Sequence, residues 1–179
     1  MFWKWKNKSN EKNKLLIETR KIILENIINE KKATEIVKNM VLLEEDSVTQ
    51  DINLYLRENK SSISSIFTIH DNIKHIKATV ATYAEGNISG LSAVLLSSGM
   101  KGKRFAYRDS TIKLLPVTKL SENLENEDEA YLVSMKRKIY ELLCKNTNQP
   151  YYKVENDCEN SILLNANESK QYGLIDNII

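Results

Sequence analysis

The stretch Tyr83–Arg104 constrains the fold more than any other part of the chain, because glycines divide it into a strand, a turn and a short helix. A β-rich run over 79–84 leads into Glu85-Gly86-Asn87. The apolar residues that follow have helical spacing and are expected to share one side: Ile88, Leu91, Val94 and Leu95. Many hydrolases hold a nucleophile and an oxyanion hole at a tight strand-to-helix turn with small residues. The segment is therefore the first place to look for a catalytic serine.

Two further glycines are expected to end this unit. Gly99 follows the short helix, and we expect it to adopt the left-handed backbone conformation that glycine takes at low cost. Gly102 is then expected to turn the chain into a strand predicted over 103–107.

Strand-like and helix-like segments alternate along the rest of the chain. β-rich runs predict strands over 20–24, 51–56, 110–114, 162–164 and 174–179. Apolar residues at helical spacing predict helices over 29–43, 63–76, 128–144, 153–159 and 165–173, with a helical turn over 14–19 and a polar loop over 57–62. This alternation predicts an α/β fold with a layered, mostly parallel sheet. We expect a single domain over 14–179 after a polar, flexible N-terminal segment over 1–13.

Composition excludes several classes of function. A net charge of +2 over 179 residues is close to neutral and gives no case for a nucleic-acid partner, whose binding usually needs a clustered basic face. No apolar run reaches the roughly 20 residues that span a bilayer, so no membrane segment is expected. The two histidines, His70 and His75, are five positions apart and do not share a helix face, and Cys144 and Cys158 form no Cys-x-x-Cys motif. No metal site is expected from this set.

Five ordered segments resemble the ClpP peptidase family of the Clp protease. They lie at compatible spacings, over 51–56, 69–71, 86–106, 147–150 and 172–176. The resemblance covers about residues 14–179 and implies a ClpP/crotonase-like fold with a protruding handle helix, the handle region lying at about 117–147. It implies no cofactor.

The positions of the family's catalytic groups do not carry catalytic side chains. The family pattern Gly-Gln-Ala-Ser/Ala-Ser-Met-Gly-Ala reads Gly-Asn-Ile-Ser-Gly-Leu-Ser-Ala over 86–93, which puts Gly90 at the nucleophile. By the same resemblance Leu115 stands at the catalytic histidine and Ser161 at the aspartate. Lys60 and Ser61 replace the two glycines of the oxyanion loop. The resemblance thus implies no catalytic residue and no enzyme activity, as in ClpR, the inactive ClpP-like subunit of plastid Clp complexes.

Two enzymatic alternatives stay open. A relocated nucleophile could be Ser89 or Ser92, since Gly90-Leu91-Ser92-Ala93 faintly imitates Gly-x-Ser-x-Gly, but a serine also needs a base within hydrogen-bond reach. A crotonase-type acyl-CoA enzyme would need a backbone amide hole, for which glycines are normally required where Lys60 and Ser61 stand.

The resemblance also implies assembly partners. It implies a homo-heptameric ring, with catalytic ClpP subunits as possible companions and a Clp ATPase chaperone as the docking partner. The docking pocket between adjacent subunits would be lined by Tyr55, His75, Tyr83, Phe105, Tyr107 and Ile179. Acidic residues crowd the handle entry and would oppose the stacking of two rings: Glu122, Glu125, Glu127, Asp128 and Glu129. A bias toward Asn, Lys and Ile fits the stroma of an apicoplast-type plastid, reached after removal of a targeting sequence.

Overall fold

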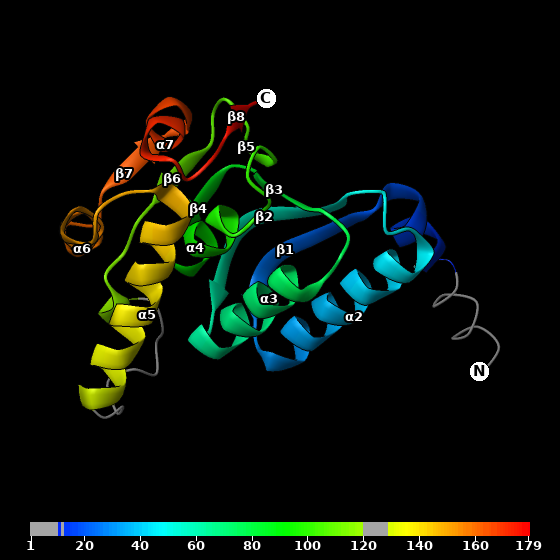
Figure 1. Ribbon diagram of the computed structural model, residues 1–179, viewed down its shortest axis with the longest axis horizontal. Coiled ribbons are helices and arrows are strands. Elements are labelled where there is room, and N and C mark those ends of the chain that lie inside the picture. The colour runs from blue at the N-terminus through cyan, green and yellow to red at the C-terminus, as the bar shows by residue number, and fades with distance from the viewer. Residues whose placement is uncertain (1–10, 12, 120–128) are drawn as a thin grey trace.

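The computed structural model describes residues 11, 13–119 and 129–179, which fold into two sheets and flanking helices (Figure 1). The larger sheet is wholly parallel and has the order β1 (Lys21–Ile28), β2 (Ile52–Ser61), β3 (Val80–Ala84), β5 (Arg104–Ala106) and β8 (Asn177–Ile178). In the smaller sheet β6 (Thr111–Lys113) pairs parallel with β4 (Asn87–Ser89) and antiparallel with β7 (Leu163–Asn165). The predicted α/β fold with a mostly parallel sheet is confirmed.

The helices fall into two groups (Figure 1). Helices α2 (Glu30–Asp46) and α3 (Ile63–His75) lie side by side on one face of the larger sheet. Helix α4 (Leu91–Ser97) contacts both sheets, and around the smaller sheet lie α6 (Tyr151–Glu159), α7 (Ala166–Tyr172) and the 3₁₀ turn η1 (Val117–Lys119). Helix α5 (Glu129–Thr147) projects away from both sheets, at the place expected for the handle helix. The acidic residues predicted before it lie outside the described residues, except Glu129.

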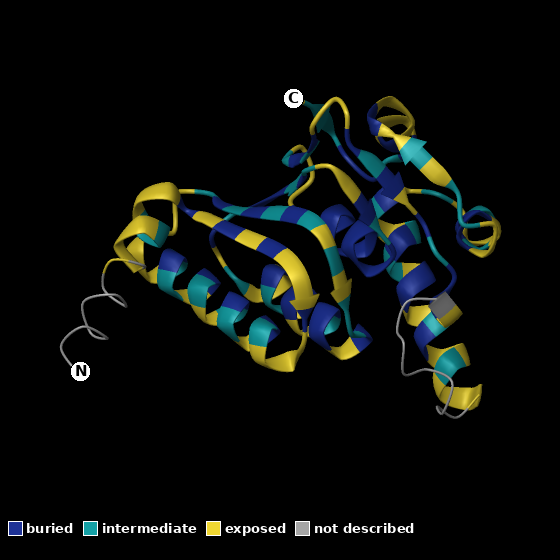
Figure 2. Cartoon of the chain, turned by 180° about the vertical axis from the view of Figure 1, so that it is seen from behind, coloured by how far each residue is buried: buried dark blue, intermediate teal, exposed yellow. Residues whose placement is uncertain are grey.

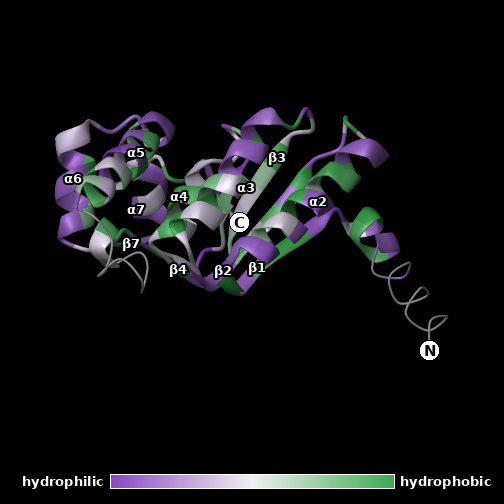
Figure 3. Ribbon diagram, turned by 90° about the horizontal axis from the view of Figure 1, so that it is seen from below, coloured by the Kyte–Doolittle hydropathy of each residue, from purple (hydrophilic) through white to green (hydrophobic). Residues whose placement is uncertain are grey.

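The core lies between the larger sheet and helices α2, α3 and α4. Helix α2 begins at Asn29, whose side chain accepts a hydrogen bond from the Lys32 amide, and it buries Ala33, Ile36, Met40 and Leu43. Alternate β2 residues face these helices and are inaccessible to solvent: Ile52, Leu54 and Leu56. Hydrophobic residues accordingly follow β1 and the adjoining side of α2 in Figure 3.

None of the described helices covers the opposite face of the larger sheet, as the rear view in Figure 2 shows. The β2 residues that point to this face, among them Asn53 and Tyr55, are only partly buried. This uncovered face contains most of the residues predicted for the docking pocket.

Two strand boundaries differ from prediction. The segment 57–61 was expected to be a loop, but β2 continues to Ser61 because β1 also continues, to Ile28, and supplies hydrogen-bonding partners. Asn26, just beyond the predicted first strand, has φ of 63° and stays within β1 opposite Asn59, where the register between β1 and β2 shifts by one residue. Long-range pairing here outweighs the polar composition of both segments.

Two expectations around α4 are wrong. Ile88 lies in β4 and not on the helix. Gly99 is not left-handed, because the glycines with positive φ in the described chain are Gly86, Gly90, Gly102 and Gly173. Glycine is required at position 99 because the backbone packs closely against Thr82 of β3. A Cβ atom there would lie 2.4 Å from Thr82 Oγ1. The prediction for Gly102, which has φ of 91°, is confirmed.

Candidate functional site

The three positions that the resemblance assigns to catalytic groups meet at one end of the smaller sheet. The Gly90 amide donates to the Lys113 carbonyl at 2.9 Å, and the Leu114 amide donates to the Ile162 carbonyl at 3.0 Å. These bonds extend the β4–β6 and β6–β7 ladders, so Gly90, Leu115 and Ser161 lie on adjacent strand ends. The structure therefore brings together a glycine, a leucine and a serine that are far apart in sequence.

Gly90 has a backbone conformation that residues with a Cβ atom adopt only under strain. Its φ is 56° and its ψ is −119°, and it stands at the N-terminus of α4, where it accepts hydrogen bonds from the Ala93 and Val94 amides. A sharp, strained strand-to-helix turn is the geometry in which α/β-hydrolases expose a nucleophile. Here glycine occupies the turn without a side chain and without the strain.

The segment at the position of the expected oxyanion loop pairs through its backbone with a neighbouring strand. Residues 57–61 are part of β2, in register with β1 through Ile27 opposite Lys60 and Ile28 opposite Ser61. An oxyanion hole needs backbone amides that are free to point at the substrate oxygen. A strand paired with β1 is a different arrangement from the glycine loop that forms such a hole.

Within the described residues, neither alternative serine forms a hydrogen bond with a histidine or a carboxylate. The Ser92 hydroxyl is buried and donates to Asn59 Oδ1 at 2.9 Å, an oxygen that also accepts from Ser61 Oγ at 2.6 Å. Ser89 lies in β4, opposite Lys113 of β6. An amide oxygen does not remove a proton from a hydroxyl at neutral pH, so the Ser92–Asn59 bond is a structural contact.

Both histidines belong to α3. His70 is buried, and its Nδ1 lies 2.9 Å from Ser98 Oγ. Burial, and next the nearby Lys74 ammonium, lower the pKa of His70, so the ring is neutral at pH 7. His75 is exposed, with its Nδ1 2.6 Å from the Asp71 carbonyl oxygen. Because Ser98 itself is inaccessible to solvent, the His70–Ser98 pair cannot reach a substrate.

An aromatic ladder crosses the uncovered face of the larger sheet. Tyr55, Tyr83 and Phe105 are directly opposite one another on β2, β3 and β5. The ring centroids of Tyr55 and Tyr83 are 4.5 Å apart, and those of Tyr83 and Phe105 are 4.8 Å apart, both pairs being stacked. Lys21 of β1 places its Nζ 5.1 Å from the centroid of the Tyr55 ring. Parallel pairing thus collects side chains from distant segments into one continuous surface.

The remaining predicted docking residues divide between two faces. Tyr107 and Ile179 are 40% and 49% exposed and lie beside each other beyond β5 and β8, since the Ile179 amide donates to the Ala106 carbonyl and its carbonyl accepts from Arg108. His75 ends α3, which covers the opposite face of the sheet (Figure 1). One copy of the chain therefore does not unite His75 with the aromatic ladder.

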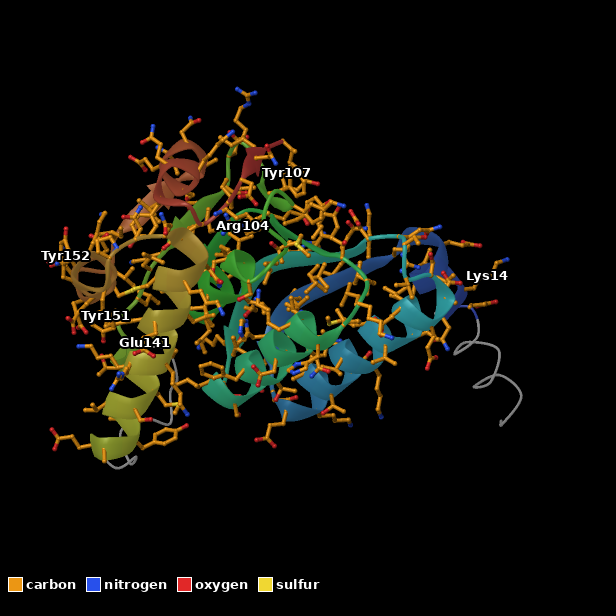
Figure 4. All side chains as sticks on the ribbon, viewed as in Figure 1. Lys14, Arg104, Tyr107, Glu141, Tyr151 and Tyr152 are labelled. Atoms are coloured by element: carbon orange, nitrogen blue, oxygen red, sulfur yellow. The ribbon has the colours of Figure 1, made fainter. Side chains whose placement is uncertain are left out.

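The sequence reading missed the residue that fixes the C-terminal strand. Arg104 is buried and forms a two-pronged ion pair with Asp176, with distances of 2.9 Å from Nε to Oδ2 and 2.6 Å from Nη2 to Oδ1. Its Nη1 also donates to the Asn146 and Gly173 carbonyls. Figure 4 shows Arg104 in the interior, below the exposed Tyr107. In the sequence, the only indication was that Lys103-Arg104-Phe105 resembles the family, and this resemblance does not reveal which residues Arg104 contacts.

No group of three or more His, Cys, Asp or Glu side chains that could hold a metal ion occurs within residues 11, 13–119 and 129–179. Over the same part of the chain, none of the helices combines the length and apolarity that crossing a membrane requires.

A comparison with protein-family models identifies the chain at the level of its family. The model described as Clp protease matches residues 5–179. The match spans both sheets, the strand ends that carry Gly90, Leu115 and Ser161, and the projecting helix α5. The chain belongs to the Clp protease family.

Proposed function

We propose that this chain is a non-catalytic, structural and regulatory subunit of the ClpR type, contributing wall to the proteolytic chamber of a Clp complex. The observation that carries the proposal is the convergence of Gly90, Leu115 and Ser161 on adjacent strand ends. None of these residues supplies a nucleophile together with a base and its orienting acid, and both histidines of the chain are on α3. Loss of a triad nucleophile alone lowers the rate of a serine protease by roughly 10⁶-fold.

The scaffold beside this emptied site supports a role in assembly. The family assembles into rings that work with Clp ATPases, and we propose a heptameric ring for this chain, alone or mixed with catalytic ClpP subunits. The aromatic ladder, with Tyr107 and Ile179, would receive the ATPase on one subunit, and His75 would come from the neighbouring subunit. This arrangement accounts for the position of His75 on the opposite face. The proposed location remains the stroma of an apicoplast-type plastid.

Fluorophosphonate labelling tests the absence of catalysis. The purified chain should remain unlabelled and should not hydrolyse fluorogenic peptides, while an active ClpP subunit in the same assay gives the positive signal. Labelling that Ser92→Ala or Ser89→Ala removes would instead establish a relocated serine hydrolase.

Native mass spectrometry tests the assembly. The chain should form seven-membered rings by itself or after co-expression with a catalytic ClpP subunit, and mixed rings would appear as intermediate masses. A monomer under both conditions would contradict the ring proposal without affecting the labelling result.

A further inference from the structure

A cavity of about 330 Å³ lies where three helices end, at the opposite end of α4 from Gly90. It is bordered by the C-terminal ends of α3, α4 and α5 and by the turn after α4. Its lining combines apolar, hydroxyl and amide groups with five cationic side chains and contains no carboxylate: Ile73, Lys74, Ile76, Lys77, Ala78, Val80, Ser97, Ser98, Gly99, Met100, Lys101, Arg104, Lys145 and Asn146. The sequence reading assigned no role to these lysines.

Four of the cations are lysines without a carboxylate partner in the described chain. Lys77, Lys101 and Lys145 are exposed and form no ion pair, and Lys74 Nζ donates only to the Ser98 carbonyl at 2.9 Å. Arg104 is different, because Asp176 neutralises it. Burial lowers the pKa of Lys74, and the charges of Lys145 and Arg104 lower it further, which shows how closely the positive groups crowd one another.

The helix C-termini and one carboxylate partly offset the positive charge of these lysines. Each helix C-terminus carries about half an elementary negative charge, so the three helix ends together offset between one and two ammonium groups. Glu44 accepts hydrogen bonds from the Lys77 and Ala78 amides and offsets another. Four ammonium groups exceed this total, so the rim keeps a positive excess.

The floor of the cavity is polar, although its buried hydroxyl groups already bond inside the protein, Ser97 Oγ and Ser98 Oγ both donating to the Val94 carbonyl. Asn146 Nδ2 lies 3.0 Å from Ser97 Oγ and 3.4 Å from Ser98 Oγ, so these groups form one polar patch among the apolar side chains. Ligand pockets generally span about 300–1,000 Å³, which limits this one to a small ligand. Lysine ammonium groups are common binders of phosphate as point charges.

We propose that this cavity binds a small phosphate-bearing molecule, whose phosphate lies among Lys74, Lys101 and Lys145. The partly apolar wall formed by Ile73, Ile76 and Met100 would contact the non-phosphate part of such a ligand. The site is separate from the triad positions and from the aromatic ladder. It therefore stands whether or not the subunit is catalytic.

Calorimetric titration of the full chain with pyrophosphate tests the proposal, at an ionic strength held constant with chloride. One saturable site per chain is expected, and the double variant Lys74→Gln/Lys145→Gln should weaken binding by about fivefold for each lysine removed. The matched control is Lys31→Gln/Lys38→Gln, which removes the same charge from exposed lysines of α2 that do not line the cavity. Equal weakening in both variants, or no saturation, would overturn the proposal.

The His70 ring gives a second readout, because its Nδ1 bonds Ser98 of the cavity and the chain contains only two histidines. Pyrophosphate in the cavity should raise the pKa of His70, measured by NMR titration, since an anion offsets the nearby lysines. An unchanged His70 pKa at saturation would place the ligand elsewhere. Vesicles of phosphatidylglycerol form the lipid arm: co-sedimentation of the chain without saturable pyrophosphate binding would reject a small-molecule site in favour of a membrane surface.

Discussion

At the scale of single residues, the close packing of the turn after α4 against β3 depends on the absence of a side chain at Gly99. A Cβ atom on Gly99 would lie 2.4 Å from Thr82 Oγ1 and 2.9 Å from Thr82 Cγ2. The Thr82 side chain cannot easily turn away, because it is inaccessible to solvent and its hydroxyl donates to the Leu96 carbonyl at 2.7 Å. Glycine is therefore required by packing and not by its backbone angles.

Gly99→Ala should accordingly destabilise the chain by about 1–3 kcal/mol, the usual cost of overpacking a core. Urea denaturation followed by circular dichroism measures this. In the background Thr82→Ala, which removes both clashing atoms, the added cost of Gly99→Ala should largely disappear. If the two substitutions were simply additive, the clash with Thr82 would not be the cause.

Gly90 makes the contrasting prediction, because its backbone angles are decisive. Gly90→Ala should destabilise by roughly 1–3 kcal/mol, since φ of 56° with ψ of −119° is sparsely populated by residues with a Cβ atom. Gly90→Ser should cost a similar amount and should yield no peptide hydrolysis, because no histidine lies on the smaller sheet. Thermal denaturation and a fluorogenic peptide assay measure the two effects. Hydrolysis by Gly90→Ser would contradict the proposed absence of a base.

At the scale of secondary-structure elements, parallel pairing determines the candidate surfaces. The sequence predicted the strands that carry Tyr55, Tyr83 and Phe105, but only their register places the rings in contact. Composition failed where pairing was long-range: the polar segment 57–61 is strand because β1 runs beside it. The cap of α7 was predictable because it is local, and Asn165 and Glu168 form a reciprocal capping box there.

The aromatic ladder allows a test of the proposed docking surface. Tyr83→Ala removes the middle ring and should weaken binding of a Clp ATPase chaperone by about tenfold or more, as expected for a central aromatic in an interface. Tyr152→Ala is the matched control, because this tyrosine is 75% exposed on α6, away from the larger sheet (Figure 4). Surface plasmon resonance with the assembled subunit measures both. Equal affinities for the two variants would exclude the ladder as the docking surface.

At the scale of the whole molecule, the Arg104–Asp176 pair ties together segments distant in sequence. It joins β5, the end of α5 through Asn146, and the C-terminal residues after α7. The sequence identified each of these segments but gave no indication that one guanidinium connects them. Buried polar contacts depend on the final packing of several elements, so neither periodicity nor spacing reveals them.

Acid denaturation tests this connection. Burial tends to raise the pKa of Asp176, but the hydrogen bonds and charge of Arg104 outweigh it and lower the pKa below the ordinary 3.8. The ionised carboxylate therefore adds stability above pH 3.8, and this contribution is lost as the pH falls through the lowered pKa. Asp176→Asn should cost on the order of 3 kcal/mol at pH 7, because it leaves a buried guanidinium unpaired. Its stability should then decline less than that of the unmodified chain between pH 5 and pH 2, as measured by urea denaturation at each pH.

The glycine at position 90 also limits which substitutions could introduce hydrolytic activity into this chain. Any single substitution there brings backbone strain at once. A serine there would stand beside the strand ends that carry Leu115 and Ser161, neither of which is a base, so we expect strain without a reaction. Hydrolytic chemistry here would need changes at several positions, and we expect every variant that replaces Gly90 to be less stable than the present chain. The relaxed turn at Gly90 would thus favour retention of the proposed non-catalytic role.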